Sequence, residues 1–479
     1  MNWPVEHIIL YGILPLLLVG TLLYGLLGGD KKGRIDKKYK LRFSLDNGSF
    51  RAENIRRGTS VIGSAGSGKT ESVIYNYLHH FGQYGFCGVI HDYKDFELTE
   101  IAAPLFREQH TQFYTIAFDE IHYRVNPIAP KYLPNEESVN ALSRVLMENL
   151  LEQNFSEHSG SNRFFSDAVE GLLSGLIWKM RTARPECCTL PHIMALFQAM
   201  STKRLVAFLK SDLTALGLAS AFINGIESEK QTAGIKSTLA NAFKKIGSRK
   251  LYYVLSKDEV PLDINHPEHR AVVSLVNNPK YDTSYSPVIA MVMHTLIKQM
   301  SVRGRDSSFL LMEEAPTLKL PNMHRIPATL RSYDISTVYV MQDKVQNDLL
   351  YGDRASKAIL SNLSYQFFGK ANDPDTAKYY ERFFEIITKP TRSISKSSGM
   401  SFESRVTKGE KEVAKRRADQ FFRLRTGEFI AFADGRDKKV RFTLQDMEKE
   451  RPQPKAPVTA ADLQVNFERI HREAKTLLG

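Results

Sequence analysis

The chain has 479 residues, of which 42% are hydrophobic and 25% charged, so it can bury a large core and divide into two to four domains. Residues 30–42 hold seven Lys or Arg and two Asp, and residues 389–425 hold eleven Lys or Arg and four Asp or Glu. These two segments account for the whole net charge of +12, which excludes a uniformly basic protein and predicts acidic partners at two places. The three cysteines show neither a disulfide pattern nor a metal-ligand spacing, and such usage is typical of a reducing compartment.

The first predicted element is a transmembrane helix. Residues 8–27 contain no charge, and twenty helical residues span ~30 Å, the thickness of a bilayer core. The positive cluster comes after this stretch, so the positive-inside rule places the N-terminus outside and the rest of the chain in the cytoplasm. We therefore expect a single-pass anchor over residues 1–29 and a basic juxtamembrane linker over residues 30–57. A buried core helix is the alternative, but the stretch has no apolar neighbour to pack against.

The next element is a strand followed by a phosphate-binding loop and a helix. The sequence GSAGSGKT fits the pattern G-x-x-x-x-G-K-[ST]. Glycines allow backbone N–H groups to close around phosphates, the lysine reaches the β- and γ-phosphates, and the threonine hydroxyl binds Mg²⁺. The predicted site for ATP and Mg²⁺ therefore comprises Gly63, Ser64, Ala65, Gly66, Ser67, Gly68, Lys69 and Thr70. The chain has neither a guanine-reading motif nor an ABC-type signature, which disfavours those two classes of nucleotide-binding protein.

Further strands and helices alternate along the chain. Strand-like runs at residues 86–92 and 113–118 precede a region whose apolar spacing of three and four residues predicts helices, and strands return from residue 270. This order predicts an α/β fold with a mostly parallel, doubly wound sheet. We expect the nucleotide-binding domain to cover residues 58–133 and 262–445, with an all-helical insertion at 134–261. We expect residues 427–444 to form a closing hairpin and residues 446–479 to form a linker with a short helix.

Two glutamates follow the apolar strand at residues 307–312. Glu313 is the predicted metal-side carboxylate, although an aspartate is usual there, and Glu314 is the candidate that orients or deprotonates the attacking water. A solvated turn is the alternative, but turns do not usually follow five apolar strand residues.

Two other polar residues are candidates for catalysis. Gln342 ends the strand at 335–342, where its amide could sense the γ-phosphate or position water. Arg331 precedes that strand and is either an arginine finger that acts across a subunit boundary or a cap of a helix C-terminus.

The basic segment at residues 389–425 has two interpretations. It either contacts the phosphate backbone of a transported strand or forms a solvated helix face with an adjoining flexible loop. Lys415, Arg416 and Arg417 are consecutive and cannot share one side of a helix, so we expect some of them to face out.

Several stretches, taken in order, resemble the coupling-protein ATPases of type IV secretion and conjugation, the TraD/TraG class. Besides the phosphate loop, VIHDYKDFE resembles the family's Asp-x-Lys-Gly-Glu strand end, with Phe96 in place of the glycine. Four further stretches resemble later family motifs. They are RVNPI, FFSDAVEGLLSGLI, the segment from EEAPTL to VYVMQD and the segment from LLYGDR to YYERFF. The likeness covers about residues 50–445.

The resemblance implies a RecA-like domain with an inserted helical domain, assembled as a homohexamer at a bacterial inner membrane. It further implies a protein that recruits relaxase-bound single-stranded DNA, or a protein substrate, and drives it to the channel components of a type IV secretion system. This sequence departs from the family in its single membrane helix, where two are common, and in Glu313.

Three functions are compatible with these features. The leading hypothesis is an ATP-hydrolysing motor, favoured by Glu314, Gln342 and Arg331 together. The second is a membrane docking receptor that binds ATP with little motor activity, favoured by Glu313. A translocase of duplex DNA is the third, but the residues after 445 are too few for the duplex-reading domain that such proteins usually add.

Overall fold

The computed structural model describes residues 35–107, 111–151, 160–396 and 404–477, together with Pro15 and Val19. The transmembrane segment predicted at residues 8–27 lies outside these ranges apart from those two residues. Within the described ranges, no helix combines the length and the apolar character that crossing a membrane requires.

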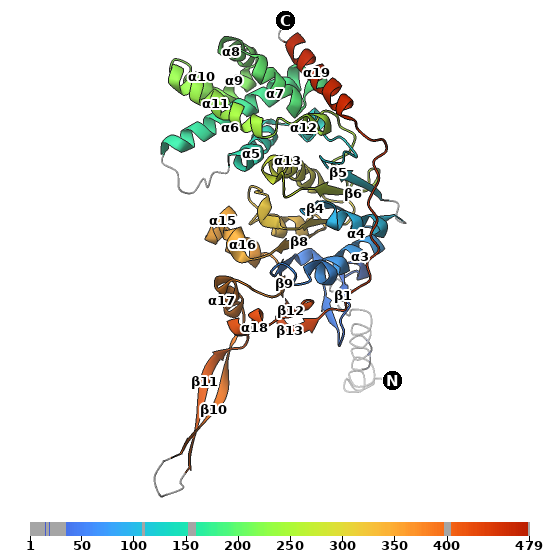
Figure 1. The fold of residues 1–479 in the computed structure, drawn as a ribbon, viewed down its shortest axis with the longest axis vertical. Coiled ribbons are helices and arrows are strands. Elements are labelled where there is room, and N and C mark those ends of the chain that lie inside the picture. Colours follow the sequence, from blue (N-terminus) through green and yellow to red (C-terminus); the bar gives the residue numbers. More distant parts are fainter. Residues whose placement is uncertain are drawn as a thin grey trace, which may run out of the picture.

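A nine-stranded sheet forms the centre of the molecule (Figure 1). Seven strands, from β9 to β5 in spatial order, are parallel, and the antiparallel hairpin of β12 and β13 closes one side. In spatial order the strands are β13 (Arg436–Arg441), β12 (Glu428–Ala433), β9 (Tyr365–Phe368), β3 (Thr59–Ile62), β8 (Ile335–Met341), β7 (Ser308–Met312), β4 (Cys87–Asp92), β6 (Ala271–Val276) and β5 (Gln112–Ile116). The prediction of an α/β fold with a mostly parallel sheet is confirmed, and so is the closing hairpin.

Helices cover both faces of the sheet, which is why its central strands read as continuous apolar runs. Successive strand residues enter different cores: Val61 packs in one cluster and Ile62 in the other. One core includes a short hairpin of β1 (Leu41–Phe43) and β2 (Phe50–Ala52). The covering helices are α3 (Tyr75–Gln83), α4 (Glu97–Phe106), α13 (Asp282–Met300), α14 (Ile326–Arg331), α15 (Lys344–Tyr351), α16 (Asp353–Ser361) and α17 (Pro374–Phe383).

Between β5 and β6, the described chain contains helices and no strands. These helices gather beyond the β5 side of the sheet (Figure 1). They are α5 (Glu136–Leu150), α6 (Gly160–Ala183), α7 (Leu190–Ala199), α8 (Thr202–Lys210), α9 (Leu213–Leu218), α10 (Ser220–Asn224), α11 (Glu229–Lys245) and α12 (Arg249–Val254). We call this group the helical bundle.

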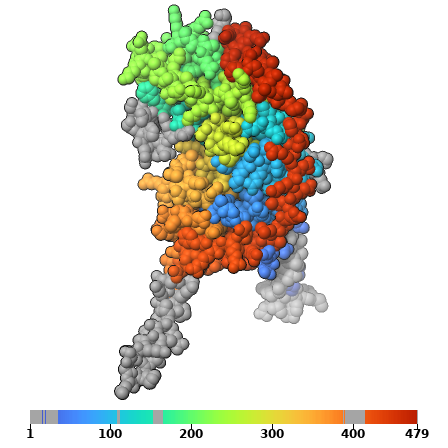
Figure 2. All heavy atoms as spheres, in the orientation of Figure 1, coloured from blue at the N-terminus to red at the C-terminus, as the bar shows by residue number. Residues whose placement is uncertain are grey.

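The C-terminal segment returns from β13 to the helical bundle. Figures 1 and 2 show it in red along one side of the molecule. It ends in α19 (Ala460–Thr476), whose Phe467 and His471 rings pack against Tyr252 of α12. The residues between β13 and α19 are called the strap below.

The basic segment does not form the helix that one interpretation expected. Strands β10 (Ile386–Lys396) and β11 (Ser404–Ala414) pair as a long antiparallel hairpin that projects from the body (Figure 1). After β11, only Ala418–Phe422 is helical, as α18. Lys415 and Arg416 both contact Asp437, at 2.5 and 2.9 Å, and Lys415 also lies 3.7 Å from Glu385, so both cations have partners within the chain.

Candidate nucleotide-binding site

The phosphate loop is hydrogen-bonded to the ends of two neighbouring strands. The Gly63 N–H donates at 3.3 Å to the carbonyl of Met341, the last residue of β8, and the Ser64 N–H donates at 2.8 Å to the carbonyl of Lys370, which follows β9. Gly66 and Gly68 have φ of +73° and +82°, a region that side chains rarely adopt. The loop therefore lies at the carboxyl edge of the sheet, where open α/β sheets bind their ligands.

Lys69 lies inside this loop. Its Nζ donates to the carbonyls of Gly63, at 2.6 Å, and Ser64, at 3.4 Å. Burial lowers the pKa of Lys69, and the charges of Glu314 and Glu313 oppose this shift. A cation held in a dry, backbone-lined loop is suited to binding an anion.

Two serine hydroxyls of the loop support an anion site. The side chains of Ser64 and Ser67 are buried, and neither hydroxyl has a hydrogen-bond partner in the described part of the chain. Buried polar groups normally have partners, so these hydroxyls fit a ligand that accepts hydrogen bonds. The phosphates of a nucleotide are such a ligand.

Glu313 follows β7 and lies at the same edge. One carboxylate oxygen accepts from Lys94 Nζ at 2.8 Å, and the other accepts from the Tyr93 N–H at 3.3 Å. The side chain is 1% exposed, and burial raises its pKa to about 7, against the effect of the nearby Lys94 charge. Burial lowers the pKa of Lys94, but the charge of Glu313 more than offsets this, and the net shift is upward.

Glu314 is held in a different way. It has φ 43° and ψ 50°, the left-handed region, and its carboxylate accepts from Gln342 Nε2 at 3.0 Å. The side chain of Glu314 is buried. Glu313 and Glu314, predicted from the end of one strand, and Gln342, predicted from the end of the next, therefore lie at the same edge as the phosphate loop.

Arg331 lies elsewhere in the chain's own fold. It is the last residue of α14 and precedes β8, whereas Gln342 follows β8. A strand of seven residues spans ~23 Å, so Arg331 lies at the amino edge of the sheet, away from the phosphate loop. Its side chain is exposed and makes no ion pair within the described ranges.

Sequence reasoning missed two contributors to the site. Lys94 follows β4 and holds Glu313, and its signal is the Asp-x-Lys pattern after an apolar strand. The turn before β12 covers the loop: Thr426 Oγ1 donates to the Gly66 carbonyl at 2.9 Å, and the Gly427 N–H donates to the Ser67 carbonyl at 3.0 Å. A Cβ at Gly68 would lie 2.9 Å from the Gly427 nitrogen, so this contact requires glycine.

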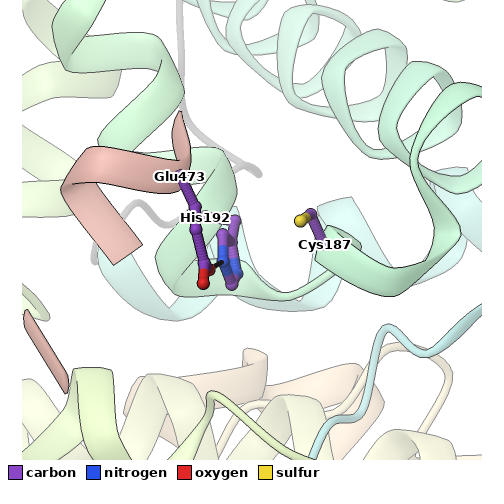
Figure 3. A group of neighbouring side chains, drawn as sticks. All are labelled: Cys187, His192 and Glu473. Carbon is purple, nitrogen blue, oxygen red and sulfur yellow. Dashed lines mark hydrogen bonds and ion pairs between the residues drawn. The ribbon is translucent and has the colours of Figure 1, made fainter. Parts of the chain in front are cut away.

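Away from the loop, Cys187, His192 and Glu473 form a group with metal-ligand atoms (Figure 3). His192 Nε2 lies 2.8 Å from a carboxylate oxygen of Glu473, and the same oxygen accepts from Arg469 Nη1 at 2.7 Å. The Arg469 guanidinium compensates the carboxylate and disfavours a further cation. Burial lowers the pKa of His192, so we interpret its contact with Glu473 as a hydrogen bond that anchors α19 to α7.

The chain matches the family described as "Type IV secretory system Conjugative DNA transfer" over residues 25–460. None of the curated proteins matches it. Among solved structures, it is similar to the bacterial conjugative coupling protein TrwBdeltaN70, at 12% identity and a TM-score of 0.67, over 89% of this chain and 93% of that one.

Two further solved structures are similar at the level of the fold. The plasmid coupling protein TrwB in complex with ADP and Mg²⁺ matches at 13% identity and a TM-score of 0.63, over 83% of this chain and 87% of that one. VirB4 of Thermoanaerobacter pseudethanolicus matches at 12% identity and a TM-score of 0.50, over 84% of this chain and 95% of that one.

Proposed function

The chain belongs to the family of type IV secretory proteins for conjugative DNA transfer, and we propose that it is a coupling protein that hydrolyses ATP to drive relaxase-bound single-stranded DNA to the secretion channel. The single observation that carries the proposal is the convergence of Lys69, Glu313, Glu314 and Gln342 at one edge of the sheet. These residues supply a phosphate-binding cation, a metal-side carboxylate and a polar pair for water.

ATP and Mg²⁺ fit this site. The phosphates would be held by the loop N–H groups from Gly66 to Thr70, by the hydroxyls of Ser64 and Ser67, which have no partner among the described residues, and by the Lys69 ammonium. Thr70, with Glu313 through water, would hold Mg²⁺, which neutralises phosphate charge when bound. TrwB has been solved with ADP and Mg²⁺ and with non-hydrolysable nucleotide analogues, which supports this assignment by likeness of fold.

Glu314 and Gln342 act on the attacking water. The buried Glu314 carboxylate accepts its proton, and the Gln342 amide holds that carboxylate in place at 3.0 Å. Glu313 must be ionised and released from Lys94 to serve a metal. The Lys94–Glu313 ion pair is therefore a resting contact that nucleotide binding replaces.

Assembly and location complete the proposal. In a homohexameric ring, the exposed Arg331 of one subunit would reach the nucleotide site of the next subunit as an arginine finger. Residues 8–27 would anchor the ring to a bacterial inner membrane beside the secretion channel.

A docking receptor with little motor activity is the second candidate, and the Lys94–Glu313 pair favours it because the metal-side carboxylate is already occupied. Measuring ATP turnover by the full-length chain, with and without single-stranded DNA, separates the two. A motor hydrolyses ATP faster when DNA is present. ATP binding without DNA-stimulated turnover would contradict the motor and support the receptor.

A further inference from the structure

A cavity lies at the amino edge of the sheet, which is the edge opposite to the phosphate loop. It has a volume of about 450 Å³ and lies between α5, the second half of α13 and the segment that runs through α14 to Tyr333. Arg144, His294, Lys298 and Arg325 line it, and none of the described residues in its lining is an Asp or Glu. We call this cavity the amino-edge groove.

The positive charge of the groove is largely uncompensated. Lys298 and Arg325 are exposed, and neither forms an ion pair within the described ranges. The chain leaves the groove at Ser301 and continues through Arg303 and Arg305, which likewise have no ion pair there. Unpaired cations around a concave surface concentrate anions.

Arg144 marks the limit of this positive region. It is half-exposed and forms a 3.4 Å ion pair with Glu170. A neighbouring cavity shares Arg144 but is also lined by Glu137, Asp167 and Glu170. An anionic chain that follows the groove would therefore meet repulsion beyond Arg144.

The groove also has groups that suit nucleotides rather than simple ions. Tyr333 lines it with a half-buried ring, and Thr329 adds a hydroxyl. Burial, assisted by the charge of Lys298, lowers the pKa of His294 to about 4, so this side chain is neutral near pH 7. Single-stranded nucleic acids bind where a positive groove is combined with an aromatic side chain that stacks on bases.

We propose that the amino-edge groove binds the backbone of single-stranded nucleic acid, with Lys298 and Arg325 on phosphates and Tyr333 stacked on a base. The inference rests on the proposed DNA-transfer function and gives it a contact surface. A duplex fits less well, because proteins that read a duplex insert a projecting helix or ribbon into its groove, whereas this surface is concave.

The test measures binding of a fluorescein-labelled oligothymidylate to the full-length chain over a series of salt concentrations. Each phosphate contact to a single strand contributes about 0.7 to the slope of log affinity against log salt, so Lys298→Ala with Arg325→Ala should reduce the slope by about 1.4. The matched control is Lys203→Ala with Arg204→Ala on α8. These residues are also an exposed Lys and Arg without an ion pair in the described chain, and their loss should leave the slope unchanged.

Two further variants separate charge from stacking. Lys298→Arg with Arg325→Lys keeps both charges and should keep the slope. Tyr333→Leu should weaken binding by about tenfold without changing the slope, since stacking is not an ionic contact.

Three outcomes would overturn the proposal. An unchanged slope for the Lys298/Arg325 double variant removes the groove from DNA binding and leaves the DNA-transfer function intact. If the double variant keeps the slope but loses the ATP hydrolysis that is measured in the absence of DNA, these cations act on a nucleotide of the adjacent subunit. Failure of the unaltered chain to bind the oligonucleotide at low salt contradicts the groove and the DNA function together.

Discussion

The two edges of the central sheet hold their charged side chains in opposite ways. At the carboxyl edge, Lys69, Glu313 and Glu314 are buried, and each contacts a polar group of the same chain. At the amino edge, Lys298, Arg325 and Arg331 are exposed and lack an ion pair within the described ranges. Burying a charge is costly unless it is paired, so the first group requires its partners to fold, whereas the second does not.

This difference separates what one chain does from what an assembly does. The charged side chains of the carboxyl edge have their partners within the chain, and we expect their variants to impair nucleotide binding or hydrolysis in every oligomeric state. The cations of the amino edge lack an ion pair in the part of the chain that the structure describes, and we expect their variants to matter only where a second molecule supplies phosphate. The following predictions test that division, beginning with the largest effect.

Lys69→Ala should reduce ATP hydrolysis to background, because the loop loses the cation that meets the β- and γ-phosphates. Turnover by the purified variant is the measurement. Lys370→Ala is the control, because that exposed residue contacts the loop through its backbone carbonyl. Hydrolysis at the normal rate by Lys69→Ala would remove ATP chemistry from the carboxyl edge.

Arg331→Ala should reduce hydrolysis about 10³-fold if Arg331 acts as a finger in the adjacent subunit. Mixing Arg331→Ala with Lys69→Ala should restore part of the activity, because one subunit offers an intact loop and the other an intact finger. Co-purification through two different tags confirms that mixed rings form. Mixed rings without any recovery would place Arg331 outside the nucleotide site.

Glu314→Gln should bind ATP and Mg²⁺ but hydrolyse ATP about 10²-fold more slowly, since the amide cannot accept the proton of water. Glu313→Asp should keep or increase activity, because aspartate is the usual residue at the metal-side position. Comparing nucleotide affinity with turnover for both variants is the measurement. An active Glu314→Gln with an inactive Glu313→Asp would reverse the two assignments.

Hydrolysis should rise with pH through about 7, because burial raises the pKa of Glu313 to that value and only the ionised carboxylate serves a metal. The effect is about tenfold for each pH unit below 7, where the ionised fraction falls. Lys94 opposes the shift, so Lys94→Ala should move the rise to higher pH. The same pH dependence of hydrolysis in the unaltered chain and in Lys94→Ala would assign the titration to another group.

The smallest effect concerns the basic segment. Arg416→Ala should lower stability by about 1 kcal/mol, because Arg416 donates to the nearly buried Asp437 carboxylate at 2.9 Å. Replacing Lys415, Arg416 and Arg417 together should change the salt slope for DNA less than the Lys298/Arg325 double variant does. A larger change would show that the compensated cations of this segment, not the amino-edge groove, contact the strand.

The sequence was sufficient for the sheet and for most of the carboxyl edge. Strands buried on both faces are continuous apolar runs, and polar residues at their ends, such as Glu314 and Gln342, lie at one edge when the strands are parallel. The parts of the site that lie at the ends of adjacent strands could therefore be predicted from the sequence.

Contacts between distant segments could not be predicted in this way. Thr426 contacts Gly66 across 360 positions of the chain, and the amino-edge groove combines residues of α5, α13 and α14. The β10–β11 hairpin was missed because its many charged residues suggested a solvated helix, whereas the antiparallel pairing of Ile386 with Ala414 through Lys396 with Ser404 satisfies its backbone.

The strap has a mechanical consequence. An inserted bundle is joined to its sheet by two covalent connections, and the strap adds a third that begins at the opposite side of the sheet. Along this path Arg451 forms a 3.1 Å ion pair with Glu120 and lies 4.0 Å above the Phe96 ring, two residues after Lys94. Tension on the helical bundle would therefore be shared along the length of the molecule and would reach the turn that holds Glu313.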